Sequence, residues 1–144
     1  MSDTNWAVPA LEHEFDVVVE LGEVADYGVT RAGHRRVVSI VGGTVTGTLE
    51  GTIVPGGADW QIVRDDGAVE IDGRYSVLTG SGALVYLQVN GVRVGGGSDG
   101  STYFRTTVHV ETSDPALSRL QDCLLVASCV RDASGVRYGA YRVT

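Results

Sequence analysis

The chain has 144 residues and a formal net charge of −7, and all of its basic residues are arginines, because it contains no lysine. This length suits one domain with a real hydrophobic core, and an acidic chain without a basic stripe is a poor nucleic-acid binder. The missing lysine excludes Schiff-base catalysis and lysine-anchored pyridoxal phosphate.

The two cysteines and the N-terminus bear on the compartment. Cys123 and Cys129 lie six residues apart, about 20 Å along one extended strand, which is beyond disulfide reach. We therefore expect two free thiols in a reducing compartment. The N-terminus lacks the basic and apolar regions of a signal peptide, and no apolar run approaches the length of a membrane span. These features predict a cytoplasmic protein that does not enter a membrane.

The first third of the chain predicts an arm followed by strands. Residues 1–12 are expected to form an N-terminal arm and residues 13–144 the folded domain. From Glu14 to Leu21 apolar and acidic residues alternate, which is the period of a strand with one buried face. Residues 28–36 carry three arginines and His34. This segment could bind an anion, but we favour a charged loop before the next strand.

The middle of the chain predicts short strands joined by tight turns. Gly42-Gly43 is interpreted as a bulge within a strand, and Pro55-Gly56-Gly57 as a turn. Further strands are expected over residues 60–64, 68–71, 74–78 and 84–89. Their connections show hairpin turn chemistry, at Asp66-Gly67, Asp72-Gly73, Gly80-Ser81-Gly82 and Asn90-Gly91.

The last third adds a rim loop, three strands and one helix. Residues 94–101 are glycine-rich and are interpreted as a mobile loop that could act as a lid. Residues 102–111 form a strand with polar side chains on one face, which is either a solvent face or a polar lumen. Asp114-Pro115 is a helix start, with Asp as N-cap and Pro at the first position. Strands over 124–130 and 136–143 complete the chain.

Together these elements predict an all-β fold. We expect a single-domain antiparallel β-barrel of about eight to ten strands and lipocalin-like size, with one short helix near residues 114–122. A small barrel encloses either side chains or one ligand. The question for function is therefore which polar groups face its lumen.

Three motifs resemble one bacterial family, DUF3237, also called the UPF0311 proteins. They are Pro55-Gly56-Gly57-Ala58-Asp59-Trp60-Gln61, Arg74-Tyr75 and Tyr103-Phe104-Arg105-Thr106. The resemblance runs from about Phe15 to Val143 and implies a compact antiparallel β-barrel, but no biochemical activity. The chain departs from the family pattern at Gly47-Thr48, where Gly-Pro is usual, and at Arg119-Leu120-Gln121, where Trp-Leu-Asn is usual.

The segment from residue 51 to 75 is the candidate site, because it places costly polar groups among apolar neighbours. A carboxylate in an apolar cavity has a raised pKa and can move a proton near neutral pH, which suits Asp59. Arginine donors suit a developing oxyanion, which suits Arg74 and Arg105. We expect these three to be catalytic. The expected ligand-binding side chains are Trp60, Gln61, Tyr75, Tyr103 and His109.

The resulting hypothesis is a cofactor-free enzyme of the isomerase, cyclase or lyase type. Its substrate would be small and mostly apolar, with a carbonyl or an oxygen anion, and family-level analogy suggests natural-product metabolism. The three histidines lack metal-ligand spacing, so no metal is expected. A non-catalytic carrier or sensor, and an oligomerisation domain, remain alternatives. In the plainest interpretation Asp59 caps its own turn or pairs with Arg74. A homodimer is possible.

Overall fold

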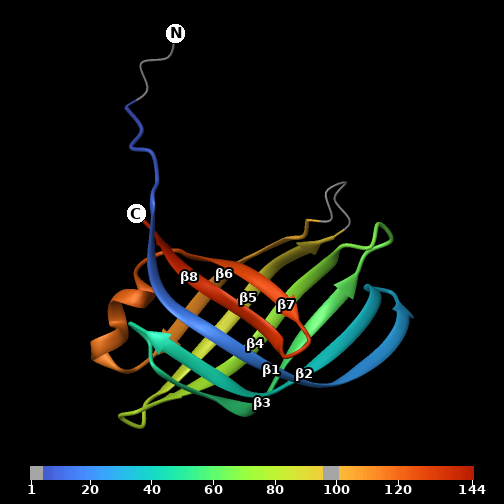
Figure 1. Cartoon of the computed structure of the whole chain (residues 1–144), viewed down its shortest axis with the longest axis horizontal. Helices are drawn as coiled ribbons and strands as arrows, with labels where there is room; N and C mark the ends of the chain where they lie inside the picture. The colour runs from blue at the N-terminus through green and yellow to red at the C-terminus, as the bar shows by residue number, and fades with distance from the viewer. Residues whose placement is uncertain (1–4, 96–100) are drawn as a thin grey trace.

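The computed structural model, which describes residues 5–95 and 101–144, is a closed antiparallel barrel. Eight strands follow one another around the barrel in chain order, and the last returns to pair with the first (Figure 1). This confirms the predicted all-β barrel and its strand number. The strands are β1 (Leu11–Thr30), β2 (Gly33–Gly47), β3 (Gly51–Val63), β4 (Val69–Thr79), β5 (Leu84–Val94), β6 (Tyr103–Thr112), β7 (Leu125–Asp132) and β8 (Gly135–Val143).

The predicted helix is present as the 3-10 helix η1 (Pro115–Gln121), between β6 and β7. The Asp114 side chain accepts a hydrogen bond of 2.9 Å from the Ala116 N–H, as an N-cap does. Proline follows at the first helical position, where no donor is lost. No helix in the described part of the chain is long and apolar enough to cross a membrane. Most of the predicted lid loop, residues 96–100, lies outside the described residues.

The expected charged loop at residues 28–36 is wrong. β1 continues to Thr30, a turn at residues 31–32 reverses the chain, and β2 begins at Gly33. Thr30 pairs with Gly33, and Asp26 pairs with Arg36 across this long hairpin. The charged residues of the segment therefore belong to strands, whose alternation sends side chains to opposite faces.

Some glycine pairs make turns and others lie inside strands. Asp66-Gly67 and residues 80–82 turn as predicted, with positive φ at Gly67 and Gly82. The Gly42-Gly43 bulge is confirmed by a register shift between Ile40 and Thr44. The other predicted turns are wrong, because they lie within β3, β4 and β5: Pro55-Gly56-Gly57, Asp72-Gly73 and Asn90-Gly91.

Close approach of neighbouring strands explains two of these strand glycines. A Cβ on Gly57 would lie 2.5 Å from the Arg74 carbonyl oxygen, and one on Gly91 would lie 2.1 Å from the Arg105 carbonyl oxygen. Only glycine leaves room for the neighbouring backbone at such sites. The Pro-Gly-Gly segment is a bulge, since the register of β3 against β4 shifts between Val54 and Ala58.

One end of the barrel is filled by apolar side chains. Phe15, Leu49 and Leu125 are almost fully buried there, and η1 adds Leu120, which is 2% exposed. Figure 1 shows the helix at one end of the barrel and the β1–β2 turn at the other. Space for a ligand is therefore to be sought toward the end opposite η1.

A buried carboxylate stabilises the η1 end. Glu14 is 5% exposed and accepts two hydrogen bonds of 2.8 Å from the Arg119 guanidinium and one of 3.1 Å from Arg142 Nε. The bonds from Arg119 outweigh the effect of burial and lower the pKa of Glu14 to about 2, with help from Thr48 and Arg142. Two departures from the family pattern, Thr48 and Arg119, thus meet at one carboxylate.

Glu14→Gln is expected to weaken the dependence of stability on acid. The pKa of Glu14 lies below its usual 4.5 in the folded state, so its ionised form stabilises the fold above about pH 4.5, and this contribution is lost as the pH falls toward 2. Urea unfolding at pH 7 and pH 3 should show a smaller loss for the variant than for the wild type. The variant should also lose about 2 kcal/mol at pH 7. An equal pH effect in both proteins would contradict this, and Glu70→Gln on exposed strand surface is the control.

Candidate functional site

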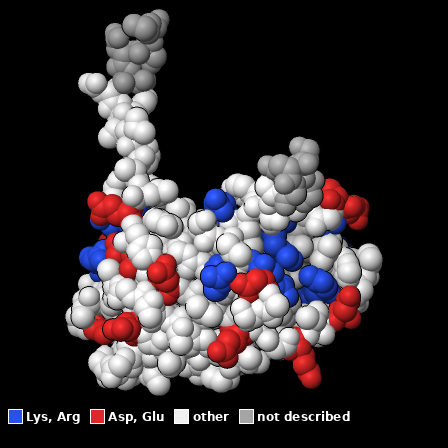
Figure 2. Space-filling view, viewed as in Figure 1, with Lys and Arg blue, Asp and Glu red and all other residues white. Residues whose placement is uncertain are grey.

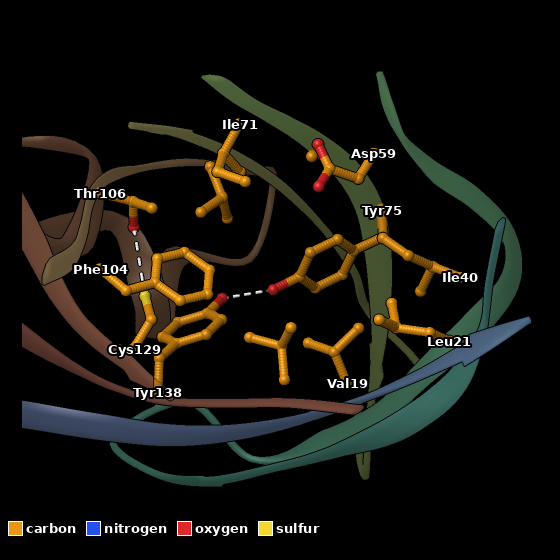
Figure 3. Close-up of a pocket in the computed structure, with 13 residues that line it drawn as sticks. Val19, Leu21, Ile40, Asp59, Ile71, Tyr75, Phe104, Thr106, Cys129 and Tyr138 are labelled. Carbon is orange, nitrogen blue, oxygen red and sulfur yellow. Dashed lines mark hydrogen bonds between the residues drawn. The ribbon is translucent and has the colours of Figure 1, made fainter. Parts of the chain in front are cut away.

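A cavity lies inside the barrel (Figure 3). Its lining residues come from all eight strands. Its volume is about 50 Å³, which is room for a few water molecules or one small part of a ligand. The polar groups in an otherwise apolar wall are few. The lining residues are Val19, Leu21, Ile40, Asp59, Ile71, Gly73, Tyr75, Val89, Phe104, Thr106, Cys129, Val136 and Tyr138.

Asp59 is the one carboxylate in this wall, and both of its oxygens are held by the protein. Oδ1 accepts a hydrogen bond of 2.9 Å from the backbone N–H of Asp72, and Oδ2 accepts one of 2.8 Å from Gln61 Nε2. Burial raises the pKa of Asp59 and outweighs these two bonds, which lower it. The carboxyl group is therefore fixed in position and more basic than an ordinary aspartate.

A directed chain of hydrogen bonds fixes the orientation of Gln61. Arg36 Nη2 donates to Gln61 Oε1 at 2.8 Å, and Gln61 Nε2 donates to Asp59. Gln61 is 4% exposed. Because its amide must accept on one side and donate on the other, it cannot turn over without placing two donors face to face. Each Asp59 oxygen keeps a further lone pair for a proton or a ligand.

A pair of buried phenols meets inside the cavity, Tyr75 from β4 and Tyr138 from β8. The Tyr75 and Tyr138 hydroxyls share a short hydrogen bond, and each residue is 5% exposed (Figure 3). Burial raises the pKa of both hydroxyls, so both are neutral donors. One hydroxyl donates to the other, and no second hydrogen bond to either is found within the described residues. One O–H is thus left to donate to a bound molecule.

The cavity thiol is not set up as a nucleophile. Cys129 Sγ lies 3.9 Å from Thr106 Oγ1, and burial raises the pKa of the thiol to about 11. A thiol of this pKa is almost wholly protonated at neutral pH, and the thiolate is the reactive form. Within residues 5–95 and 101–144, no three His, Cys, Asp or Glu side chains gather to hold a metal ion.

The structure brings three of the sequence-predicted site residues together. Asp59 and Tyr75 line the cavity, and Gln61 bonds to Asp59 from behind. Neither plain alternative for Asp59 holds, since its carboxylate binds the N–H of Asp72 on the next strand and Arg74 binds another carboxylate. Tyr138 was missed, although it alternates with Val136 and Ala140 on the apolar face of the last strand.

The expectation that Arg74 and Arg105 face the lumen is corrected. Arg74 follows the inward-facing Gly73 and so points outward, where it binds Asp72 at 3.1 Å and lies 5.7 Å from the centre of the Trp60 ring. Arg105 is also exposed and donates to the Phe104 carbonyl oxygen at 3.0 Å. Neither reaches the cavity that Asp59 lines.

The remaining three predicted residues also lie on the outer surface. Trp60 is 38% exposed and Tyr103 is 56% exposed. His109 is exposed and binds Glu111 at 2.9 Å. The face of β6 that carries Tyr103, Arg105 and His109 is thus the solvent face of the two possibilities.

Comparison with known proteins gives a consistent family and fold. The family described as "Protein of unknown function (DUF3237)" matches residues 9–143. A UPF0311 protein of Bradyrhizobium diazoefficiens is 31% identical over 144 residues, covering 92% of this chain and 95% of that protein.

Two solved structures match over nearly the whole chain. A structure described as a beta-barrel like protein from Acinetobacter baumannii has a TM-score of 0.90 and 37% identity, and the match covers 97% of this chain and 99% of that one. A structure described as an enzyme from Penicillium herquei has a TM-score of 0.80 at 17% identity, covering 99% of this chain and 100% of that one. The second likeness shows a shared fold.

Proposed function

This chain belongs to the DUF3237 (UPF0311) family. We propose that its barrel binds a small molecule and converts it by acid–base catalysis without a cofactor. The observation that carries the proposal is a fixed carboxyl group, Asp59, in the wall of an apolar cavity. The shared fold with a protein described as an enzyme is compatible with this, but the cavity's own residues carry the argument.

The geometry supports the following roles. The Asp59 carboxylate takes a proton from a carbon or hydroxyl of the substrate. The electron pair that is released moves toward a carbonyl oxygen, which accepts a hydrogen bond from the Tyr75–Tyr138 pair. The Asp59 carboxylic acid then returns the proton to another atom of the same molecule or, in an elimination, to the leaving group as its bond to carbon breaks. No electron acceptor is needed, so the net change is an isomerisation, a cyclisation or an elimination.

The environment suits this chemistry in two ways. The raised pKa of Asp59 brings its proton affinity closer to neutral pH, where a general base works best. The apolar walls lower the local dielectric constant, which strengthens electrostatic interactions with the reacting atoms. The substrate class is a small, mostly apolar carbonyl compound of bacterial metabolism, with natural products as the first set to screen.

The test is a screen of such compounds for conversion by the wild-type protein and by Asp59→Asn. Conversion that depends on Asp59 supports the enzyme. A compound that raises the melting temperature and is recovered unchanged would instead indicate a carrier or sensor using the same cavity.

Removing both cavity hydroxyls is expected to slow turnover strongly. Tyr75→Phe/Tyr138→Phe keeps the ring volumes but leaves no donor for the carbonyl oxygen, so kcat should fall about 10- to 1000-fold. KM should change little, because the lost hydrogen bond strengthens in the transition state. Steady-state kinetics measure the split. Tyr86→Phe, whose hydroxyl lies 3.4 Å from Gln88 outside the cavity, is the control. An unchanged kcat in the double variant would remove the phenols from the mechanism.

A further inference from the structure

Three arginines stand on the inner face of the barrel beyond the cavity. Arg36 pairs in register with Gln61, Arg93 with Phe104, and Arg131 with Val136. Phe104 and Val136 line the cavity, and partners in register share a face of the sheet. We call Arg36, Arg93 and Arg131 the arginine rim.

The arginine rim lies at the end of the barrel opposite η1. Arg93 and Arg131 come near the C-terminal ends of β5 and β7, and Arg36 near the start of β2. In an antiparallel barrel these strand ends meet at the same rim. Figure 2 shows arginine side chains gathered toward this half of the molecule. A molecule that enters the cavity from this end passes the rim.

The rim arginines lack the ion pairs that other arginines of the chain form. Among the described residues no carboxylate lies within 4.0 Å of a rim guanidinium, whereas the arginines that do form ion pairs are Arg64, Arg74, Arg119, Arg137 and Arg142. Arg36 Nε is buried without a hydrogen-bond partner within that same part of the chain. The chain as a whole carries a net charge of −7, so the excess of positive charge at the rim is local.

The carboxylates nearest to the arginine rim form no ion pair with it in the described part of the chain. Asp26 pairs in register with Arg36, but its carboxylate binds His34 at 2.8 Å and the Gly28 N–H at 2.9 Å. Burial is the main cause that lowers the pKa of Arg93, and repulsion by Arg131 and Arg36 lowers it further. Attraction by Asp59 acts in the opposite direction and is weaker. The result is a cluster of like charges without a carboxylate partner among the described residues, in which Arg36 Nη2 donates to Gln61 and Arg36 Nε has no acceptor.

We propose that the arginine rim binds an organic oxyanion, and that the substrate of the proposed reaction carries a carboxylate or phosphate head held there while its apolar part enters the cavity beside Asp59. Arginine presents paired donors that match these heads, and charge-assisted bonds of this kind are the strong ones. Arg93 also lies 5.9 Å from the centre of the Phe104 ring, which helps to orient its guanidinium at the cavity wall. That the bound molecule is a substrate rests on the proposed function, whereas the presence of an oxyanion site does not.

The test is isothermal titration of the full chain with matched amphiphiles. Two series carry an oxyanion: the alkyl carboxylates from butanoate to octanoate, and the corresponding alkyl phosphates. Two control series of equal length are the 1-alkanols, which are uncharged, and the alkylammonium ions, which are cations. We expect the best oxyanion to bind at least about tenfold tighter than its alkanol, with affinity falling as salt rises. Carboxylate and phosphate arms identify the head that is preferred. Arg36→Gln, Arg93→Gln and Arg131→Gln should each weaken oxyanion binding about tenfold.

The outer-face arginines supply the matched controls. Arg74→Gln and Arg105→Gln remove the same charge without touching the rim and should leave oxyanion affinity within about twofold. Arg131 is exposed, so its variant tests the proposal even if a buried rim variant fails to fold. Absence of oxyanion binding, equal binding of the alkanol, or equal losses in rim and control variants would overturn the proposal.

Asp59→Asn separates this inference from the proposed function. The substitution removes a negative charge beside the rim, so oxyanion binding should be kept or strengthened while turnover is lost. Rim-dependent binding without any Asp59-dependent turnover leaves the oxyanion site standing and refutes the enzyme. Turnover that depends on Asp59, but changes neither with the rim variants nor with the charge of the substrate, supports the enzyme and refutes the oxyanion site.

Discussion

Asp59→Asn is expected to abolish turnover while ligand binding stays almost intact. The amide cannot accept a proton near neutral pH, and loss of a positioned general base costs about 10²- to 10⁴-fold in kcat. The side chain keeps its size, so the cavity wall keeps its shape. Turnover and ligand affinity should be measured together in the variant, by kinetics and by isothermal titration.

The control is Asp72→Asn, on the neighbouring strand. The Asp72 side chain forms an ion pair with the outward-facing Arg74. Its hydrogen bond to Asp59 comes from the backbone N–H, and the substitution keeps this donor. Its turnover should be near wild type. Because Asn has one acceptor oxygen, Asp59→Asn leaves either Gln61 Nε2 or the Asp72 N–H without an acceptor, so melting temperatures are needed, and Asp59→Ala serves as a second variant. Unchanged turnover in both would take Asp59 out of the mechanism.

The raised pKa of Asp59 fixes the sign of two pH effects. Proton abstraction needs the carboxylate, so kcat should rise with pH through a pKa above the ordinary 3.8. Stability runs the other way. Because the folded pKa is above the unfolded one, the contribution of Asp59 to stability is full below the unfolded pKa and is lost as the pH rises through the folded pKa. The fold thus gives up stability at the pH where the base is active.

Gly91→Ala is expected to destabilise the fold by about 3 kcal/mol or to prevent folding. Its Cβ would lie 2.1 Å from the Arg105 carbonyl oxygen and 2.6 Å from Thr106 Cα. Both are backbone atoms of β6, paired with β5 along ten register positions from Val85 to Val94, so they cannot move aside without breaking the ladder. Equilibrium unfolding in guanidinium chloride measures the loss.

Gly80→Ala provides the comparison. Nothing lies within 4 Å of a Cβ built there, and its φ is not in the left-handed region. Its free energy of unfolding should be within about 0.5 kcal/mol of wild type. Equal stability of the two variants would show that β5 and β6 can separate at Gly91 without cost.

The sequence predicted the barrel because its strands carry the period of two that a half-buried sheet requires. Phe15, Val17 and Val19 show it, and Asp66-Gly67 shows the turn chemistry between strands. It failed at Asp72-Gly73 and Asn90-Gly91, which look like turns but lie inside strands, and Gly91 leaves room for the backbone of the neighbouring strand. Which backbone passes close by is a property of the pairing, and local sequence does not contain it.

The site was predicted in part for the same reason. Asp59 and Gln61 were found because polar side chains lay among apolar ones. Arg74 was expected beside Tyr75, yet successive residues of a strand face opposite ways, so only one of the two could enter the lumen. Arg36 belonged to the segment 28–36 for which anion binding was the less favoured alternative to a charged loop, and its inward direction depends on the register with β3.

The pairing of β1 with β8 has a consequence for how the molecule is made. Phe15 pairs with Ala140 and Leu11 with Val143, so the ring closes only between the two ends of the chain. A contact so distant in sequence carries a large loop-closure entropy, and proteins rich in such contacts fold slowly. During synthesis one edge of β1 stays unpaired until β8 has left the ribosome. The wall of the cavity beside Asp59 is complete only after that, because β8 contributes to it.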